Sequence, residues 1–194
     1  MNIRTTVCEN RLMLVLVVGP SGAGKDTIMR SAQAKLANCG AIRFVKRFVT
    51  RRASDFEENV PVDPATFAHM KESGAFAFTW AAHGLRYGIP ADIGPDIAEG
   101  KCVVVNGSRG IIAEAAIAFP TGVILVTAPL EILTARLMAR GREDEEDIRR
   151  RLRRSVPIPS SVTSGTVVND SAIELGAERF IAELTRLMAH GPRA

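Results

Sequence analysis

The sequence has few of the aromatic residues that stack on nucleic-acid bases. It contains one Trp and one Tyr among 194 residues, whereas single-stranded nucleic acid is bound on platforms of several such rings. No recognised nucleic-acid-binding motif is present either. The net charge of +4 therefore fits small anionic substrates better than nucleic acid, and we expect no nucleic-acid partner.

Cysteine and histidine are equally scarce, and neither is clustered. Three scattered residues of each type do not have the spacing of a zinc site or of a disulfide framework. An odd number of separated cysteines is typical of reducing compartments, so we expect small buried thiols and a cytoplasmic protein. The residues concerned are Cys8, Cys39, Cys102, His69, His83 and His190.

Long hydrophobic runs are also missing. The apolar run 12–18 is far too short to span a membrane. Arg4 and Arg11 precede it, as in a signal peptide, but cleavage there would destroy the glycine-rich loop that follows. We therefore expect neither a membrane partner nor export. An apolar content of 46% and a charged content of 24% indicate one globular domain over 1–194.

The glycine-rich loop is the most informative segment. It follows a predicted buried strand and precedes a predicted helix, which is the arrangement of a phosphate-binding loop. The glycines let backbone N–H groups converge on a triphosphate, and the Lys supplies a point charge for the β- and γ-phosphates. The loop predicts ATP as ligand, held by Gly19, Pro20, Ser21, Gly22, Ala23, Gly24, Lys25, Asp26 and Thr27.

Asp26 departs from the usual pattern, in which a Ser or Thr that binds Mg²⁺ follows the Lys. The hydroxyl comes one position later, at Thr27. We expect Asp26 and Thr27 to be the protein ligands of Mg²⁺, although Asp26 could instead form a hydrogen bond within the loop. Because a lone carboxylate repels a triphosphate, Mg²⁺ or an arginine is expected beside it.

Apolar strand candidates alternate with helical stretches along the chain. This alternation predicts an α/β fold of three layers, in which a parallel sheet has helices on both faces. The expected strands are 12–18, 102–105, 123–126 and 166–168, and the expected helices are 25–36, 93–99, 110–118, 130–140, 143–155 and 176–188.

Two segments interrupt the alternation. Residues 46–90 lack a clear strand–helix rhythm, and residues 139–155 are densely charged. Insertions of this kind in a P-loop core hold the acceptor or close over the donor and exclude water. We therefore expect an acceptor-binding subdomain at 46–90 and a lid at 139–155.

Arginines in both segments are candidates for phosphate contacts. Arg136, Arg140 and Arg142 flank a flexible glycine, and fixed guanidinium groups there stabilise charge on a transferred phosphoryl group. In the first segment, the hydroxyl of Thr50 and the guanidinium groups of Arg51 and Arg52 can bind an acceptor phosphate. Salt bridges to Glu57 and Glu58 are the alternative for Arg51 and Arg52, and the arginines at 149–154 are explained by helical i,i+4 pairs.

These motifs resemble those of the guanylate kinase branch of the P-loop nucleoside monophosphate kinases. The resemblance runs from about residue 12 to residue 187, and it implies the fold of that family with an acceptor insertion and a lid. The matching pieces are the loop 19–25, Thr50-Arg51, Trp80, Tyr87-Gly88, the arginines 136, 140 and 142, and Val168-Asn169-Asp170.

The chain departs from true guanylate kinases at several positions, including the stretch 74–78 and the strand end Val105–Arg109. Those enzymes have carboxylates that bind guanine where this chain has the apolar run 74–78, and a guanine with unsatisfied N–H groups would lose about 1–3 kcal/mol per group. The departures look like the ribose 1,5-bisphosphate phosphokinases of bacterial phosphonate catabolism. The Gly-Lys-Asp loop end, Glu58-Asn59, the run Val104–Arg109 and Arg140-Gly141-Arg142-Glu143 match that family.

This second resemblance implies transfer of the ATP γ-phosphoryl group to the 1-phosphate of ribose 1,5-bisphosphate, with Lys25 and the three lid arginines as catalytic residues. The acceptor oxygen is already ionised, so no general base is required. A guanylate kinase and an inert guanylate-kinase-like binding module remain as alternatives. The chain could be a monomer or a homodimer. The expected acceptor-binding residues are Thr50, Arg51, Arg52, Glu58, Tyr87, Asn106, Ser108 and Arg109, with capping of the next helix as the alternative role for Asn106.

Overall fold

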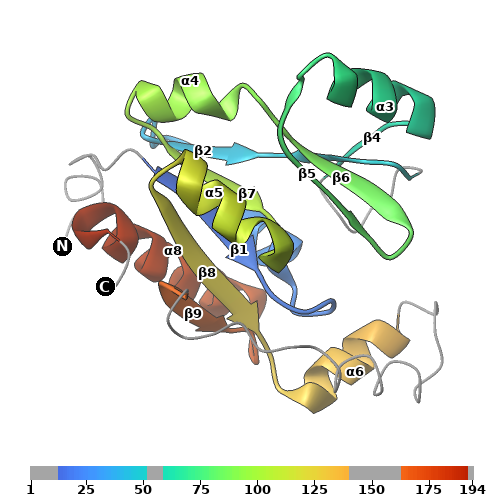
Figure 1. Ribbon diagram of the computed structural model, residues 1–194. Coiled ribbons are helices and arrows are strands. Elements are labelled where there is room, and N and C mark those ends of the chain that lie inside the picture. The colour runs from blue at the N-terminus through green and yellow to red at the C-terminus, as the bar shows by residue number, and fades with distance from the viewer. Residues whose placement is uncertain (1–12, 52–58, 140–162, 192–194) are drawn as a thin grey trace.

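A five-stranded parallel sheet forms the centre of the protein (Figure 1). The computed structural model describes residues 13–51, 59–139 and 163–191. All four strand pairings are parallel, in the order β2-β7-β1-β8-β9. The strands are β1 (Met13–Val18), β2 (Ile42–Val45), β7 (Cys102–Asn106), β8 (Thr121–Thr127) and β9 (Gly165–Val168).

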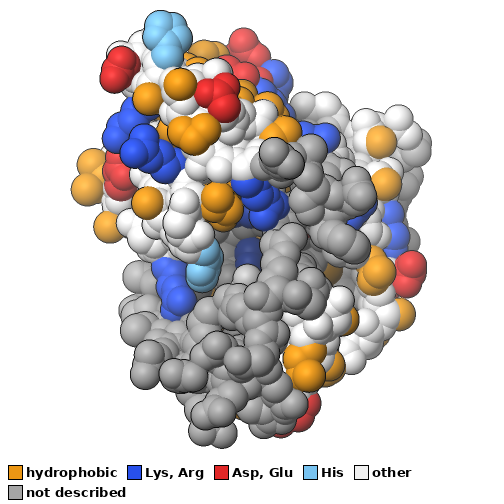
Figure 2. Space-filling view, turned by 90° about the vertical axis from the view of Figure 1, so that its right-hand side faces the viewer, with side chains coloured by type: hydrophobic (Ala, Val, Ile, Leu, Met, Phe, Trp, Pro, Cys, Tyr) orange, Lys and Arg blue, Asp and Glu red, His pale blue; other side chains and the backbone are white. Residues whose placement is uncertain are grey.

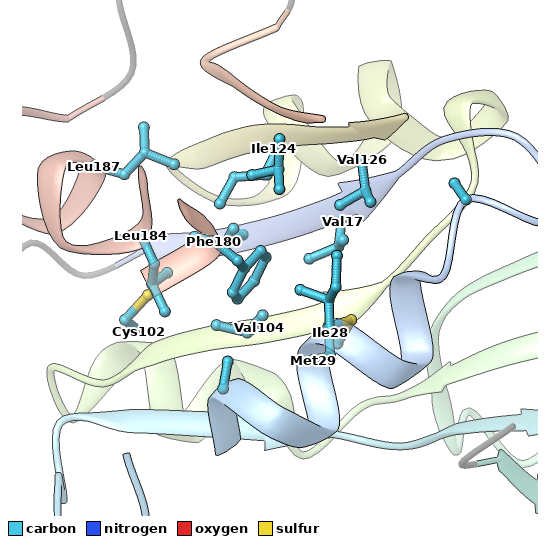
Figure 3. Close-up of a cluster of buried hydrophobic side chains, with 14 of the residues drawn as sticks. Val17, Ile28, Met29, Cys102, Val104, Ile124, Val126, Phe180, Leu184 and Leu187 are labelled. Carbon is cyan, nitrogen blue, oxygen red and sulfur yellow. The ribbon is translucent and has the colours of Figure 1, made fainter. Parts of the chain in front are cut away.

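Helices cover both faces of this sheet because the central strand is apolar on both faces. Every residue of β1 is buried, and alternate side chains enter two separate hydrophobic clusters. The first cluster holds Val17 against α2 (Lys25–Lys35) and α8 (Ile173–His190), as Figure 3 shows. The second holds Leu16 against α4 (Ile93–Ala98) and α5 (Ile112–Ala118). The three-layer α/β fold expected from the sequence is confirmed.

A second sheet occupies the segment that the sequence left without a rhythm. Its order is β4-β3-β6-β5, and only the β3–β4 pairing is parallel. Aromatic rings pack on it, since the Phe76 ring lies 5.4 Å from that of Phe48 and 4.8 Å from that of Phe67. The elements are β3 (Arg47–Val49), β4 (Asn59–Pro61), α3 (Pro64–Glu72), β5 (Phe76–Ala82) and β6 (Leu85–Pro90).

The two sheets are joined by one nearly continuous extended segment. Strand β2 belongs to the parallel sheet and β3 to the second sheet, with Lys46 alone between them. Residues at this junction therefore lie beside the carboxyl ends of β2 and β7, where α/β folds bind their ligands.

Most expected elements of the parallel layer are present, with shifted ends. The helix expected at 130–140 is α6 (Leu130–Met138), and η1 (Arg109–Ile111) precedes α5. Helix α8 begins at Ile173, before the expected start at Gly176. Gly176 lies inside the helix, and a Cβ there would be 3.1 Å from Ile28 Cδ1, so the glycine lets α8 approach α2 closely. The helix expected at 143–155 lies outside the described residues.

None of the helices in the described ranges combines the length and the hydropathy that a membrane span requires. The same ranges contain no cluster of three or more His, Cys, Asp or Glu residues suited to a metal ion.

Burial of Cys102 predicts a loss of stability at alkaline pH. Burial, together with the nearby Cys39, raises the pKa of the Cys102 thiol from 9.0 to about 12. The unfolded thiol loses its proton above pH 9 and the folded thiol does not, so stability falls as the pH rises from 9 to 12. The expected loss at pH 10 is about 1.4 kcal/mol. Urea unfolding under reducing conditions at pH 8, 9 and 10 measures it.

The Cys102→Ala variant should lack this part of the pH dependence, whereas Cys39→Ala, at a half-buried position, should retain most of it, because burial is the larger cause of the raised pKa. Equal slopes for wild type and Cys102→Ala between pH 8 and pH 10 would contradict the prediction.

Candidate active site

The glycine-rich loop connects β1 to α2 in a conformation that depends on its glycines. Gly22 and Gly24 have φ of +85° and +82°, values that L-residues with side chains rarely adopt. Gly19 has φ +148°, and a Cβ there would lie 1.9 Å from the carbonyl oxygen of Val126 in β8. The loop therefore passes so close to the neighbouring strand that no side chain fits at Gly19.

The Lys25 side chain is hydrogen-bonded to the loop that precedes it. Its Nζ donates hydrogen bonds to the carbonyl oxygens of Gly19, at 2.8 Å, and Pro20, at 3.0 Å. Helix α2 begins at Lys25, so its N-terminal N–H groups and the ammonium lie at the same place. That combination binds phosphate groups.

Asn169 supports the loop from the other side. It follows β9, its side chain is buried, and its Nδ2 donates to the carbonyl oxygen of Ala23 at 2.8 Å. The backbone N–H of Asn169 donates a hydrogen bond to the carbonyl oxygen of Thr127 in β8. A Cβ at Gly24 would lie 2.4 Å from Asn169 Nδ2, so this side chain fills the space beside the left-handed turn. In the sequence, Asn169 stands out only through the match of Val168-Asn169-Asp170 to guanylate kinases.

Of the three lid arginines expected from the sequence, the described residues include Arg136. Helix α6 places its Nη1 3.5 Å from the carbonyl oxygen of Gly22, which puts the guanidinium beside the phosphate-binding loop. Arg140, Arg142 and all but Ala139 of the expected lid 139–155 lie outside the described residues.

Asp26 is paired with Asn106. The Asn106 Nδ2 donates to Asp26 Oδ1 at 2.7 Å, across 80 positions of sequence. Asn106 ends β7, and the residue is only 4% exposed. The alternative that Asn106 caps the next helix does not apply, because the Ser108 hydroxyl accepts the hydrogen bond from the Gly110 N–H. This hydrogen bond therefore ties the carboxyl end of β7 to the residue that follows Lys25 of the phosphate-binding loop.

Arg47 connects this point to the second sheet. Its Nε donates to Asn59 Oδ1 at 2.9 Å, and its Nη1 donates to the backbone carbonyl of Asn106 at 3.3 Å. The guanidinium lies 5.0 Å from the ring centroid of Tyr87, and that ring stacks on Trp80 at 5.2 Å. Figure 2 shows Lys and Arg side chains around a recess on the face toward which the β5–β6 hairpin points.

The other expected acceptor residues that the structure describes lie near the end of β3, in β6 or after β7. Thr50 Oγ1 accepts a hydrogen bond from the Arg86 N–H at 2.8 Å, and Arg51 follows it, half-buried. Tyr87 is buried, with its ring faces against Arg47 and Trp80. The remaining ones are Arg109, which is exposed at the start of η1, and Arg52 and Glu58, which lie outside the described residues.

The residues present suit ATP and Mg²⁺. The loop offers left-handed glycines, helix N–H groups and the Lys25 ammonium for phosphate oxygens. Carboxylate and hydroxyl oxygens, as in Asp26 and Thr27, are ligands that Mg²⁺ prefers. The bond from Asn106 fixes the orientation of the Asp26 carboxylate.

Sequence reasoning did not assign a site role to Arg47 or Arg30. Two signals were available for them. Arg47 precedes the Thr50-Arg51 motif by three positions, within the segment expected to bind the acceptor. Asp26 and Arg30 are four positions apart on the helix that starts at the phosphate-binding loop, so they share a face as well.

Comparison with known proteins decides the family. The ribose 1,5-bisphosphate phosphokinase PhnN of Rhizobium etli is 42% identical over 182 residues, which cover 92% of each chain. The protein of the same name from Acidiphilium cryptum is 44% identical over 174 residues, covering 89% of this chain and 92% of that one. The chain belongs to the ribose 1,5-bisphosphate phosphokinase family. The membership expected from its motifs is therefore confirmed, and the chain is a kinase.

Other relatives are longer. The bifunctional ribose 1,5-bisphosphokinase-thymidine phosphorylase of Cupriavidus pinatubonensis is 46% identical over 168 residues, which are 85% of this chain but 28% of that protein. Among solved structures, guanylate kinase from Anaplasma phagocytophilum superposes with a TM-score of 0.62 at 16% identity, covering 92% of this chain and 86% of that one. This likeness shows the fold alone. No protein-family model matches the chain.

Proposed function

We propose that the chain transfers the γ-phosphoryl group of ATP to the 1-phosphate of ribose 1,5-bisphosphate, releasing ADP and 5-phospho-α-D-ribose 1-diphosphate. The membership in a family named for this kinase activity supports the proposal. The site chemistry agrees with it, because the described part of the site combines a phosphate-binding loop with several cations.

The observation that carries the proposal is the bond between Asp26 and Asn106. It joins the donor loop to the carboxyl end of β7, and Arg47 joins the same point to the second sheet. An acceptor bound there has its reacting phosphate next to the β- and γ-phosphates that Lys25 would hold. Positioning of this kind is the main contribution of proteins to phosphoryl transfer.

The reaction needs charge compensation more than acid–base catalysis. An ionised oxygen of the acceptor 1-phosphate attacks the γ-phosphorus, and the bond from that phosphorus to the β–γ bridging oxygen breaks to release ADP. No proton leaves the attacking oxygen. Lys25 and Arg136, with Arg140 and Arg142, stabilise the negative charge during transfer. Mg²⁺ held by Asp26 and Thr27 would supply further charge compensation at the β- and γ-phosphates.

The two insertions have separate roles in this proposal. Residues 46–90, which contain the second sheet, bind the acceptor through the Thr50-Arg51 motif and neighbouring residues. Residues 139–155 act as the lid that excludes water. The apolar 74–78 stretch agrees with an acceptor that has no base, since Phe76 and Phe78 pack against other aromatic rings instead of facing a purine.

A product assay tests the proposed function. The protein is incubated with ATP, Mg²⁺ and either ribose 1,5-bisphosphate or GMP, and the products are followed by ³¹P NMR and mass spectrometry. We expect the diphosphate doublet of 5-phosphoribosyl 1-diphosphate and little GDP. Formation of GDP without a sugar diphosphate would show a guanylate kinase instead. Absence of any ATP turnover would show an inert binding module.

A further inference from the structure

A pocket beside Asp26 is lined by Arg47 and by two further cations that the proposed chemistry has not used. It lies between α2 and the junction of β2 with β3. Besides the apolar Met29, Phe44 and Val45, its wall consists of Asp26, Arg30, Gln33, Lys46, Arg47 and Asn106.

The fold brings these side chains together from three elements. Asp26, Arg30 and Gln33 are spaced i, i+4 and i+7 on α2, so they share one face of the helix. Lys46 and Arg47 come from the single-residue junction and the first position of β3. Asn106 closes the wall at the end of β7 and bonds Asp26.

The chemistry of the wall indicates an anionic ligand. Three cations, from Arg30, Lys46 and Arg47, accompany the single carboxylate of Asp26. Arg30 and Lys46 are exposed at the pocket, where a ligand can reach them. Arg47 is held by Asn59, Tyr87 and the Asn106 carbonyl, so its guanidinium has a fixed position. Fixed and reachable cations around one small pocket suit a phosphate group.

We propose that this pocket binds the acceptor phosphate that does not react, the 5-phosphate of ribose 1,5-bisphosphate. Arg30 and Lys46 contact that phosphate, and Arg47 positions the wall. The inference rests on the proposed function. It separates two phosphate positions: the reacting 1-phosphate beside Lys25, and the 5-phosphate on the far side of Asp26.

Two phosphate positions make the pocket a determinant of specificity. An acceptor that lacks the 5-phosphate leaves the contacts of Arg30 and Lys46 unused, so it should react with a lower kcat/KM. Hydrogen bonds from charged groups are strong enough for a discrimination of about 10- to 100-fold per residue.

The test compares ribose 1,5-bisphosphate with α-D-ribose 1-phosphate, which has the same reacting phosphate and no 5-phosphate. The variants are Arg30→Gln and Lys46→Met. Lys35→Met is the matched control, because Lys35 lies on the same helix but pairs with Glu178 away from the pocket. Initial rates give kcat and KM for both acceptors, and calorimetry gives the affinity of each variant for ribose 5-phosphate.

The expected result is a loss of about 10- to 100-fold in kcat/KM for the bisphosphate in both pocket variants, mainly through KM. Their kcat/KM for ribose 1-phosphate should stay within about threefold of wild type, and their affinity for ribose 5-phosphate should fall in parallel. Lys35→Met should behave as wild type. Equal losses for both acceptors, or no loss for the bisphosphate, would overturn the inference while leaving the proposed function intact. A wild-type protein that does not phosphorylate the bisphosphate would overturn both.

Discussion

The Lys25→Met variant is expected to fold normally and to lose about a thousandfold in kcat. In the wild type, the Lys25 ammonium lies against the loop carbonyls, with Nζ 2.8 Å from the Gly19 oxygen and 3.0 Å from the Pro20 oxygen. In the reaction we expect the same ammonium to follow the charge that develops on the β- and γ-phosphates. Removing one preorganised charge of this kind costs on the order of 10²–10³ in rate, and more in phosphoryl transfer.

The measurement is single-turnover formation of the sugar diphosphate, together with a thermal unfolding curve. Lys25→Arg separates charge from geometry. A planar guanidinium cannot reproduce a compact ammonium between two carbonyl groups, so this variant should also lose most of its activity. A Lys25→Met protein with wild-type kcat would show that the lysine has no catalytic role.

The Gly19→Ala variant is expected to lose both stability and ATP binding. An added Cβ would lie 1.9 Å from the Val126 carbonyl oxygen, and φ of +148° is itself strained for alanine. Because the contact is with backbone, β8 or the loop must move, at a cost of about 3 kcal/mol or more. The same movement displaces the carbonyl group that Lys25 binds.

Gly40→Ala is the control for this substitution. Gly40 follows α2, and a Cβ there meets nothing within 4 Å. Urea unfolding and the affinity for a non-hydrolysable ATP analogue should therefore be close to wild type for Gly40→Ala and strongly reduced for Gly19→Ala. A Gly19→Ala protein that binds the analogue with wild-type affinity would contradict the close approach of the loop to β8.

Most of the parallel layer was predictable because its signals are local, although the short edge strand β2 was not expected from the sequence. An all-apolar strand followed by a glycine-rich loop defines β1 and α2 within about twenty residues of sequence. The second sheet was not predictable in this way. Its strands β3 and β4 have three residues each, which is too short for a hydrophobic period to emerge. Strand β3 is fixed by pairing with β6, strand β4 is fixed by pairing with β3, and aromatic rings pack on the sheet.

The candidate site was likewise predictable only in part. The phosphate-binding loop could be read from adjacent residues, and the anomaly at Asp26 could be seen but not explained. Its partner Asn106 is 80 positions away, and the strand order alone places β7 beside β1. We expected Mg²⁺ or an arginine next to Asp26. The structure places the Asn106 amide there, with Arg47 lining the same pocket.

The junction of β2 with β3 limits where residues can be inserted or deleted without disturbing the site. Side chains of an extended segment point alternately to opposite sides. One residue inserted next to Lys46 would reverse this alternation along β3. Phe48 would then point toward Asn106 and Tyr87, and the Arg47 guanidinium would be turned toward the Phe76 ring, away from Asn59. Insertions and deletions should therefore be tolerated after α2, near Gly40, but selected against at Lys46.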